Sequence, residues 1–398
     1  MSEPSRSELP SEASPSAAPH AAAPAEAPAL TDSAKHRSLI ARAAELRHRY
    51  HKWEMVLFFA GGFVFDAYML QRIDDTPMLL QQGAYLLVAG ILIVLGHLIE
   101  AREVELKGIL KKLWRVGDPL IHFMLGTLLN AFMIFYMKAS SGLTAALFFV
   151  VIAGSLAINE LPYFHRFGRL VLLGLYSFCV TSYFAYLLPV LLGRIRAWMF
   201  YLAVAGAVGV LALLGKLFAR SQPKGGWRQV MVPGLAVQAA LAGLYLLHLI
   251  PPVPLSVEEL GIYHEVARAP GGGYQLSHLP GAWWQVWKTD DRAFVARPGD
   301  KVFCFVRVFA PRNFHDRIVV RWSFDDPKRG WVDQGALPLS IVGGREEGFR
   351  GYAYKAHYQP GDWKVSVETE DGRTVDDLSF TITASGDTSE RLFAHDPA

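Results

Sequence analysis

Residues 79–99 have the sequence LLQQGAYLLVAGILIVLGHLI, which contains no Asp, Glu, Lys or Arg. A helix of this length, rising about 1.5 Å per residue, crosses the roughly 30 Å hydrocarbon core of a bilayer. Similar apolar blocks recur along the chain, so the sequence predicts a polytopic membrane protein with an all-α transmembrane bundle of about seven spans. Within a bundle covering residues 53–254, we expect these spans at 53–71, 79–99, 118–138, 142–160, 169–191, 196–216 and 229–250.

The segment before the first span divides into two parts. Residues 1–34 are rich in Ala, Pro, Ser and Glu and contain almost no large apolar side chain, so we expect a disordered tail. Between residues 35 and 52, Leu39, Leu46 and Tyr50 recur at helical spacing, and basic residues occupy many of the remaining positions. This pattern predicts a basic amphipathic helix that lies on the membrane surface before the first span.

The orientation of the chain is predicted from the basic residues of its short connections. With a cytoplasmic N-terminus, the segments 35–52, 99–117, 160–169 and 216–228 face the cytoplasm and hold 17 Lys and Arg, against 4 in the opposite connections. The positive-inside rule therefore predicts a cytoplasmic N-terminus. Seven spans then place the region from residue 255 onward in the periplasm, whereas one span more or fewer would place it in the cytoplasm.

The helical pattern stops after Pro251, where short strand-like segments separated by turn signals begin. This pattern predicts a soluble, all-β, immunoglobulin-like sandwich domain over residues 255–384, followed by a flexible tail at 385–398. The expected strands are 261–268, 274–278, 301–309, 317–323, 336–342, 350–358, 362–369 and 375–383.

Charge and cysteine content narrow the class of function. Residues 1–254 hold 22 Lys and Arg against 15 Asp and Glu, whereas residues 255–398 hold 17 against 21. The basic half suits the anionic headgroups of the lipid bilayer, and no soluble basic cluster indicates a nucleic-acid partner. Only two cysteines occur, Cys179 in an apolar block and Cys304 in an expected strand, and both are predicted to be buried. No motif indicates a cofactor, and no residue is assigned as a metal ligand.

The C-terminal region contains a set of short motifs rich in Gly, Pro and Trp. They are Val308-Phe-Ala-Pro, Arg321-Trp322, Leu337-Pro-Leu, Gly343-Gly-Arg345, Gly348-Phe-Arg350-Gly, Pro360-Gly-Asp-Trp363-Lys-Val-Ser-Val and Asp371-Gly-Arg373. Over residues 283–383 this set resembles a bacterial domain of unknown function, the type numbered 2914, which often lies at the C-terminus of multi-span inner-membrane proteins. The resemblance implies a bacterial inner-membrane location and a C-terminal soluble domain. It implies no activity.

Ionisable side chains within the spans are candidate functional residues, because burying one at a helix centre costs roughly 2.5 to 3.5 kcal/mol. Asp66 of the first span is a candidate for a proton or cation site, or for a hydrogen bond between helices. His97 and Glu100 lie about one helical turn apart, and His122 and Glu160 are expected at a similar depth on the next two spans. Histidines and carboxylates on facing helices can bind zinc or iron, but side chains at headgroup depth are often polar as well.

Small residues at helical spacing indicate close contacts between helices. They are Gly83, Gly90 and Gly96 in the second span and Ala203, Gly206 and Gly209 in the sixth. Such residues let helix backbones approach closely, so packing is the favoured interpretation over a substrate pathway.

Aromatic and basic side chains of the C-terminal domain are candidate contacts for a ligand or partner. Trp283, Trp284 and Trp287 precede the main strands and suit contact with a partner or with lipid headgroups. Arg345 and Arg350 lie in a charged, glycine-rich segment, which is either a recognition patch or a solvated loop.

No catalytic motif is evident, so no catalytic residue is assigned. We expect a non-enzymatic membrane protein whose bundle anchors a periplasmic β-sandwich that binds a periplasmic protein or a cell-envelope glycan. The alternative is a membrane transporter or an intramembrane enzyme that uses the polar residues of the bundle.

Overall fold

The computed structural model describes residues 75–398 except 106, 141–145, 147–149, 156–167, 271, 282–283, 286–287, 313 and 343–347. The tail expected at 1–34, the basic helix expected at 35–52 and the span expected at 53–71 lie outside the described residues. The span expected at 142–160 is described only at residue 146 and at residues 150–155, which are helical.

Five helices among the described residues are long and apolar enough to cross a membrane. They are α2 (Thr76–Ala101), α3 (Gly108–Lys138), α6 (Gly168–Leu192), α7 (Ala197–Ser221) and α8 (Gly226–Leu246). Each overlaps one of the expected spans over most of its length. α2 has proline in its first turn, where the missing N–H costs no helical hydrogen bond.

α3 is longer than the sequence predicts. It begins at Gly108 rather than at residue 118, although its apolar part begins only at Pro119. The added turns are rich in Lys and Leu, which favour helix, and water can solvate their charged side chains. The connection expected at 99–117 is therefore confined to the residues between Ala101 and Gly108.

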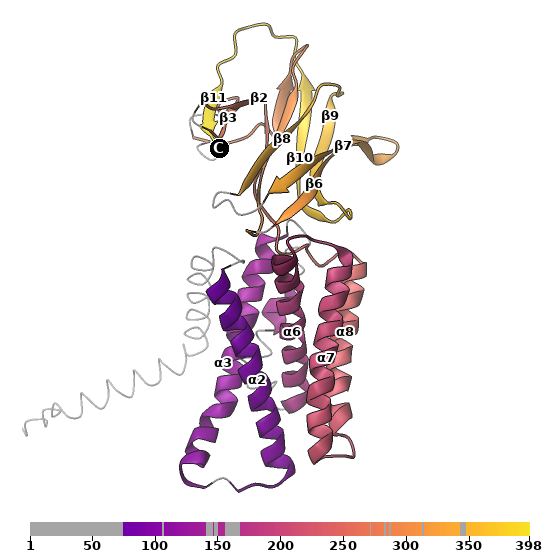
Figure 1. Cartoon of the computed structure of the whole chain (residues 1–398). Coiled ribbons are helices and arrows are strands. Elements are labelled where there is room, and N and C mark those ends of the chain that lie inside the picture. Colours follow the sequence, from indigo (N-terminus) through magenta and orange to yellow (C-terminus); the bar gives the residue numbers. More distant parts are fainter. Residues whose placement is uncertain are drawn as a thin grey trace, which may run out of the picture. The chain divides into compact units, whose positions relative to one another are not determined.

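α6 has the most helical neighbours in the described bundle. It contacts α2, α3, α7 and α8, and Figure 1 shows it among these helices. Its side chains Tyr176, Phe178 and Cys179 are buried, as are Ala203 and Ala207 on α7. The buried position predicted for Cys179 is confirmed.

The region after α8 folds into short strands. They are β1 (Ser256–Tyr263), β2 (Glu265–Arg268), β3 (Tyr274–His278), β4 (Ala293–Ala296), β5 (Val302–Phe309), β6 (His315–Asp326), β7 (Gly330–Val342), β8 (Phe349–Lys355), β9 (Gly361–Thr369), β10 (Thr374–Ala384) and β11 (Ala394–Pro397).

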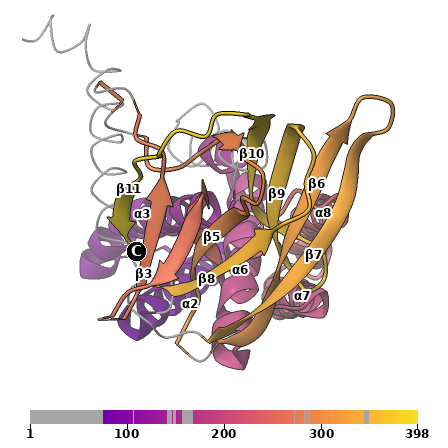
Figure 2. The same cartoon turned by 90° about the horizontal axis from the view of Figure 1, so that it is seen from above.

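Three sheets form from these strands. β1, β5 and β8 form the first; β4, β10, β9, β6 and β7 form the second in that order; and β11, β3 and β2 form the third. Pairing is antiparallel except between β4 and β10. Figure 2 shows β10, β9, β6 and β7 side by side.

β5 is covered on both faces. Cys304 and Val306 belong to a buried cluster shared with Val320 of β6 and with other side chains of the second sheet. Phe305, which points to the opposite face, packs with Tyr263 in a separate cluster beside the third sheet. This double coverage explains the nearly continuous apolar sequence of β5. Cys304 is buried, as predicted.

The strand pattern departs from the expected one at three places. The strand expected at 261–268 is divided at His264, because β1 pairs with β5 whereas β2 pairs with β3. β4 was not expected, and its four residues are too few to show alternation. The segment expected as a flexible tail at 385–398 contains β11, which pairs with β3 through backbone hydrogen bonds that the sequence Ala-His-Asp-Pro does not reveal.

Candidate functional site

His97 and Glu100 meet the side chain of Arg169 where α2 ends and α6 begins. Arg169 Nη1 lies 3.0 Å from His97 Nδ1, and Arg169 Nη2 donates to the Glu100 carboxylate. The His97 ring is buried and stacks on Phe218 of α7 with centroids 3.7 Å apart. The cluster joins three helices, and a cation of the protein lies beside both candidate metal ligands.

The other intramembrane candidates are His122, Asp66 and Glu160. His122 lies half-buried on α3, and Asp66 and Glu160 lie outside the described residues. Over the part of the chain that the structure describes, no three His, Cys, Asp or Glu side chains converge as metal ligands would. A role of these residues in transport or catalysis stays a prediction.

A second polar cluster lies between α6 and α8, and sequence reasoning missed it. Gln238 Nε2 donates to Ser177 Oγ at 2.8 Å and lies 2.7 Å from Thr181 Oγ1, and all three side chains are buried. Thr181 Oγ1 also bonds to the carbonyl oxygen of Ser177 at 2.9 Å. The network satisfies its own hydrogen bonds, so it suits helix association better than ligand binding. The sequence feature that could have indicated this cluster is Gln238, a glutamine within an apolar span.

Arg196, which immediately precedes α7, joins the bundle to the β-domain formed by β1–β11. Its Nη1 donates to both carboxylate oxygens of Asp316 on β6, at 2.9 and 2.8 Å, and its Nη2 donates to Glu370 at 2.6 Å. The backbone N–H of Ile195 also donates to Asp316, at 3.0 Å. The hydrogen bond to Asp316 is the main cause that raises the pKa of Arg196 above its usual value.

Arg373, between β9 and β10, makes a second contact with the bundle. Its guanidinium carbon lies 3.5 Å from the ring centroid of Tyr245 near the end of α8, and Nη1 donates to the Tyr245 carbonyl oxygen at 3.3 Å. The Tyr245 ring in turn stacks on Phe200 of α7 with centroids 3.9 Å apart. A planar cation over an aromatic face is a favourable contact, especially where it is removed from water.

The residues proposed from sequence as ligand contacts in the β-domain are described only in part. Trp284 is 53% exposed, and Arg350 lies half-buried on β8 in register with Arg307 of β5. Trp283, Trp287 and Arg345 lie outside the described residues. Binding by this set stays a prediction.

A pocket on the second sheet was missed by sequence reasoning. Its volume is about 280 Å³. It is lined by Arg292, Asp325, Trp331, Asp362, Trp363, Ser379, Phe380 and Thr381. Trp331 alone was a detectable signal, because a tryptophan beside the Gly330 turn is an unusual surface residue.

Comparison with known proteins identifies the C-terminal segment. Residues 315–382, from the start of β6 into β10, match the family described as "Protein of unknown function (DUF2914)", within the range 283–383 that the motifs indicate. No curated protein matches the chain.

Two solved structures show a weak likeness. One is a β-glucosidase from Listeria innocua in complex with gluconolactone, with 10% identity and a TM-score of 0.17 over 31% of this chain and 16% of that chain. The other is the alkylpurine DNA glycosylase AlkC of Pseudomonas fluorescens bound to DNA containing an abasic site analogue, with 9% identity and a TM-score of 0.21 over 79% of this chain and 99% of that chain. Likeness at this level supports neither a fold nor a function. The likeness to a known family thus rests on the sequence match of residues 315–382 to the DUF2914 family of unknown function.

Proposed function

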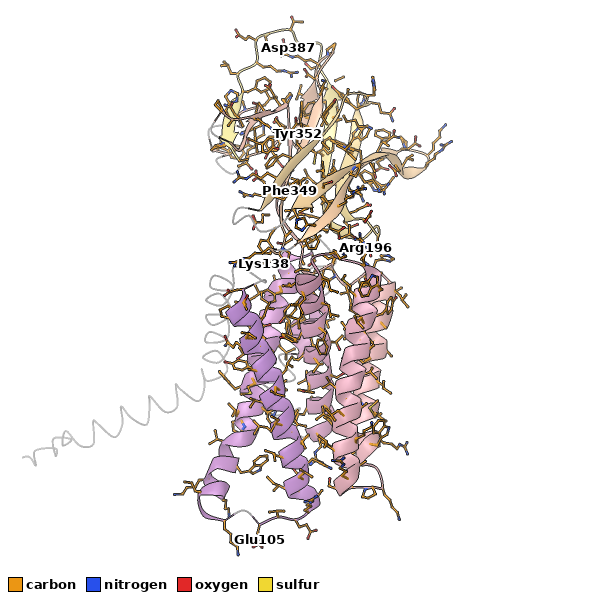
Figure 3. All side chains as sticks on the ribbon, viewed as in Figure 1. Glu105, Lys138, Arg196, Phe349, Tyr352 and Asp387 are labelled. Carbon is orange, nitrogen blue, oxygen red and sulfur yellow. The ribbon has the colours of Figure 1, made fainter. Side chains whose placement is uncertain are left out.

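We propose that this chain is a bacterial inner-membrane protein of seven spans that holds an immunoglobulin-like β-sandwich in the periplasm, where the domain binds a protein or glycan of the cell envelope. The observation that carries the proposal is the position of the basic residues relative to the β-domain. Figure 3 shows Lys138 and Arg196 at the end of the helices next to the β-domain and Glu105 at the opposite end.

The far end of the bundle carries the larger number of basic side chains. Those near the α2–α3 and α7–α8 connections are Arg102, Lys107, Lys111, Lys112, Lys216, Arg220, Lys224 and Arg228. Near the β-domain the described basic residues of the bundle are Lys138, Arg194 and Arg196, and Arg196 is neutralised by Asp316 and Glu370. The positive-inside rule applied to these ends favours a cytoplasmic far end and a periplasmic β-domain.

The orientation inferred from the two ends of the bundle does not depend on the total number of spans. α8 ends at Leu246 and β1 begins at Ser256, so the β-domain follows from the end of α8 that lies away from Lys224. In addition, α3 ends beside the β-domain while Arg169 at the start of α6 contacts the end of α2, so the chain changes ends between Lys138 and Gly168. That change supports the span expected at 142–160.

Cysteine labelling in intact cells tests the orientation. Cys179 and Cys304 are fully buried and serve as a silent background. Lys328→Cys, in the exposed β6–β7 turn, is expected to react with a membrane-impermeant maleimide in intact cells. Its matched control Lys224→Cys, in the exposed α7–α8 connection, is expected to react only after permeabilisation. The reverse pattern would place the β-domain in the cytoplasm and end the proposal.

Ligand binding is tested separately with the whole protein in lipid nanodiscs. We expect it to cosediment with membrane-free cell-wall material, and treatment of that material with protease or with periodate separates a protein ligand from a glycan. No cosedimentation with either treated or untreated material would contradict a binding role.

The alternative function, a transporter or intramembrane enzyme, has one supporting observation, the contact of the buried His97 and the exposed Glu100 with Arg169. That contact is also explained by helix packing, so the binding function remains the one that the arrangement favours.

A further inference from the structure

Four strands of the second sheet place a row of side chains across its solvent-facing surface. Asp325 of β6 pairs in register with Trp331 of β7, and Thr381 of β10 pairs with Asp362 of β9. The ladder between β6 and β9 ends at Phe324 and Trp363, so Asp325 and Asp362 are the next residues of the two strands. The row Trp331, Asp325, Asp362 and Thr381 is therefore continuous across β7, β6, β9 and β10.

The neighbours of this row face the opposite side of the sheet. Phe324, Trp363 and Phe380 alternate with the row and are buried in the hydrophobic core. Trp331 itself is 46% exposed, although an indole usually gains from burial. The row thus borders the 280 Å³ pocket, with Arg292 and Ser379 as further polar lining.

The polar groups of the pocket include both donors and acceptors. Thr381 Oγ1 donates to Asp362 Oδ1 at 2.6 Å, which leaves the second oxygen of this carboxylate as a further acceptor. Arg292 directs its Nε to Asp290 at 3.0 Å, and Lys364 Nζ lies 4.9 Å from the centre of the Trp331 ring. Two carboxylates, Asp325 and Asp362, and one cation, Arg292, therefore line the pocket, and Lys364 lies over the Trp331 ring.

From this arrangement we propose that the pocket binds one sugar residue of a neutral glycan, an inference that names the ligand class of the proposed envelope-binding function. Carboxylate oxygens accept hydrogen bonds from neighbouring sugar hydroxyls, the hydroxyl and cationic groups donate to ring and hydroxyl oxygens, and the indole packs against the apolar C–H face of a pyranose. The pocket is slightly smaller than the roughly 300 to 1,000 Å³ typical of sites for drug-sized ligands, so it accommodates one unit of a longer chain.

Charge distinguishes this ligand from two others. An anionic ligand would lie against Asp325 and Asp362, whose like charge disfavours it. A cationic amine would compete with Lys364 for the face of Trp331, where a cation of the protein is already placed. A neutral polyhydroxylated ligand carries no charge that Asp325, Asp362 or Lys364 would repel.

Binding is tested by calorimetric titration of the full chain in phosphatidylcholine nanodiscs, because the sugar headgroups of glycoside detergents would compete for the pocket. The probes are cellotetraose, maltotetraose and chitotetraose, with spermidine as the cationic comparison. Saturable binding of at least one tetrasaccharide at millimolar concentration is expected. No tetrasaccharide binding, or binding of spermidine in competition with the sugar, would overturn the proposal.

Substitutions locate the site. Trp331→Ala is expected to weaken tetrasaccharide binding about tenfold because the stacking surface is lost, and Asp362→Asn is expected to weaken it less. Tyr354→Ala is the matched control, because Tyr354 is 54% exposed on β8 and also lies under a lysine, with Lys301 Nζ at 4.9 Å. Equal weakening by the control and by Trp331→Ala would overturn the assignment of the pocket.

The glycan site can be absent while the proposed periplasmic orientation still holds, and the two experiments separate these outcomes. Maleimide labelling does not involve Trp331, so a periplasmic β-domain that binds no neutral sugar would leave the orientation intact and remove only the glycan site. Unchanged melting temperatures of the variants exclude unfolding as the cause of lost binding.

Discussion

The side chain of Arg196 forms ion pairs between the bundle and the β-domain. In the proposed orientation Arg196 lies in an outer connection, where an arginine opposes the positive-inside rule. Its guanidinium is held by Asp316 and Glu370 of the β-domain. The Asp316 side chain is only 7% exposed, so it needs a hydrogen-bonded counter-charge. Arg196 therefore serves to join the bundle and the β-domain.

Cys304 permits a prediction at the residue scale. Burial disfavours its thiolate and raises the pKa from 9.0 to about 12. In a Cys179→Ala variant, alkylation of Cys304 is expected to stay slow as the pH rises from neutrality to 9.0, and to become fast on addition of denaturant. Mass spectrometry of the labelled protein measures both rates.

The same pKa shift has a consequence for stability. Because the folded-state pKa is raised, the contribution of the protonated thiol is fully present below 9.0 and is lost as the pH rises toward 12. Cys304→Ser should remove this part of the alkaline pH dependence. Rapid labelling of the native protein near neutral pH would show that the core around β5 opens readily.

At the scale of elements, glycines of α2 set its distance from α6. Tyr176 Oη donates to the carbonyl oxygen of Leu86 at 3.2 Å, and Tyr183 Oη donates to that of Leu79 at 3.1 Å. These bonds require α6 tyrosines to reach the backbone of α2, beside Gly83 and Gly90. A Cβ atom at Gly90 would lie 2.5 Å from Tyr176 Oη, which is closer than van der Waals contact allows.

Gly90→Ala is therefore expected to destabilise the bundle by about 1 to 3 kcal/mol through overpacking. The measurement is the apparent melting temperature in nanodiscs. Gly209→Ala is the matched control, because a Cβ there meets no atom within 4 Å. Tyr176→Phe combined with Gly90→Ala should recover part of the loss, since the clash is with the hydroxyl group. Equal melting temperatures of Gly90→Ala and the control would contradict the packing argument.

At the scale of the whole molecule, the contacts of Arg196 and Arg373 shield the link between bundle and β-domain. Ile250, Val253 and Leu255 of this link are buried, with exposed fractions of 3%, 7% and 2%. A protease can cut a buried link only when the surrounding contacts open.

The double variant Arg196→Ala/Arg373→Ala is expected to be cleaved within residues 247–256 much faster than the wild type, while the bundle and the β-domain stay intact. Limited proteolysis with mass spectrometry detects the cut. Arg194→Ala/Arg329→Ala replaces two exposed arginines and should leave the rate unchanged. Equal protection in both double variants would show that the arginine contacts do not hold the β-domain in place.

The local composition of the sequence was sufficient to predict much of the architecture. The five described helices, the change from helices to strands after Pro251 and the burial of Cys179 and Cys304 all follow from patterns within about 20 residues. Such patterns show whether the side chains of a segment favour lipid, the protein core or water. This can be judged without knowing which distant residues the segment contacts.

Tertiary structure alone decided which distant residues meet. The contact of Arg196 with Asp316, the pairing of β11 with β3, and the row from Trp331 to Thr381 join residues far apart in the chain. No local pattern encodes these contacts, because they depend on how strands order within a sheet and on which helix ends lie beside them. The sequence by itself determined a membrane bundle followed by a β-domain; folding determined where that domain is held and which of its surfaces forms a pocket.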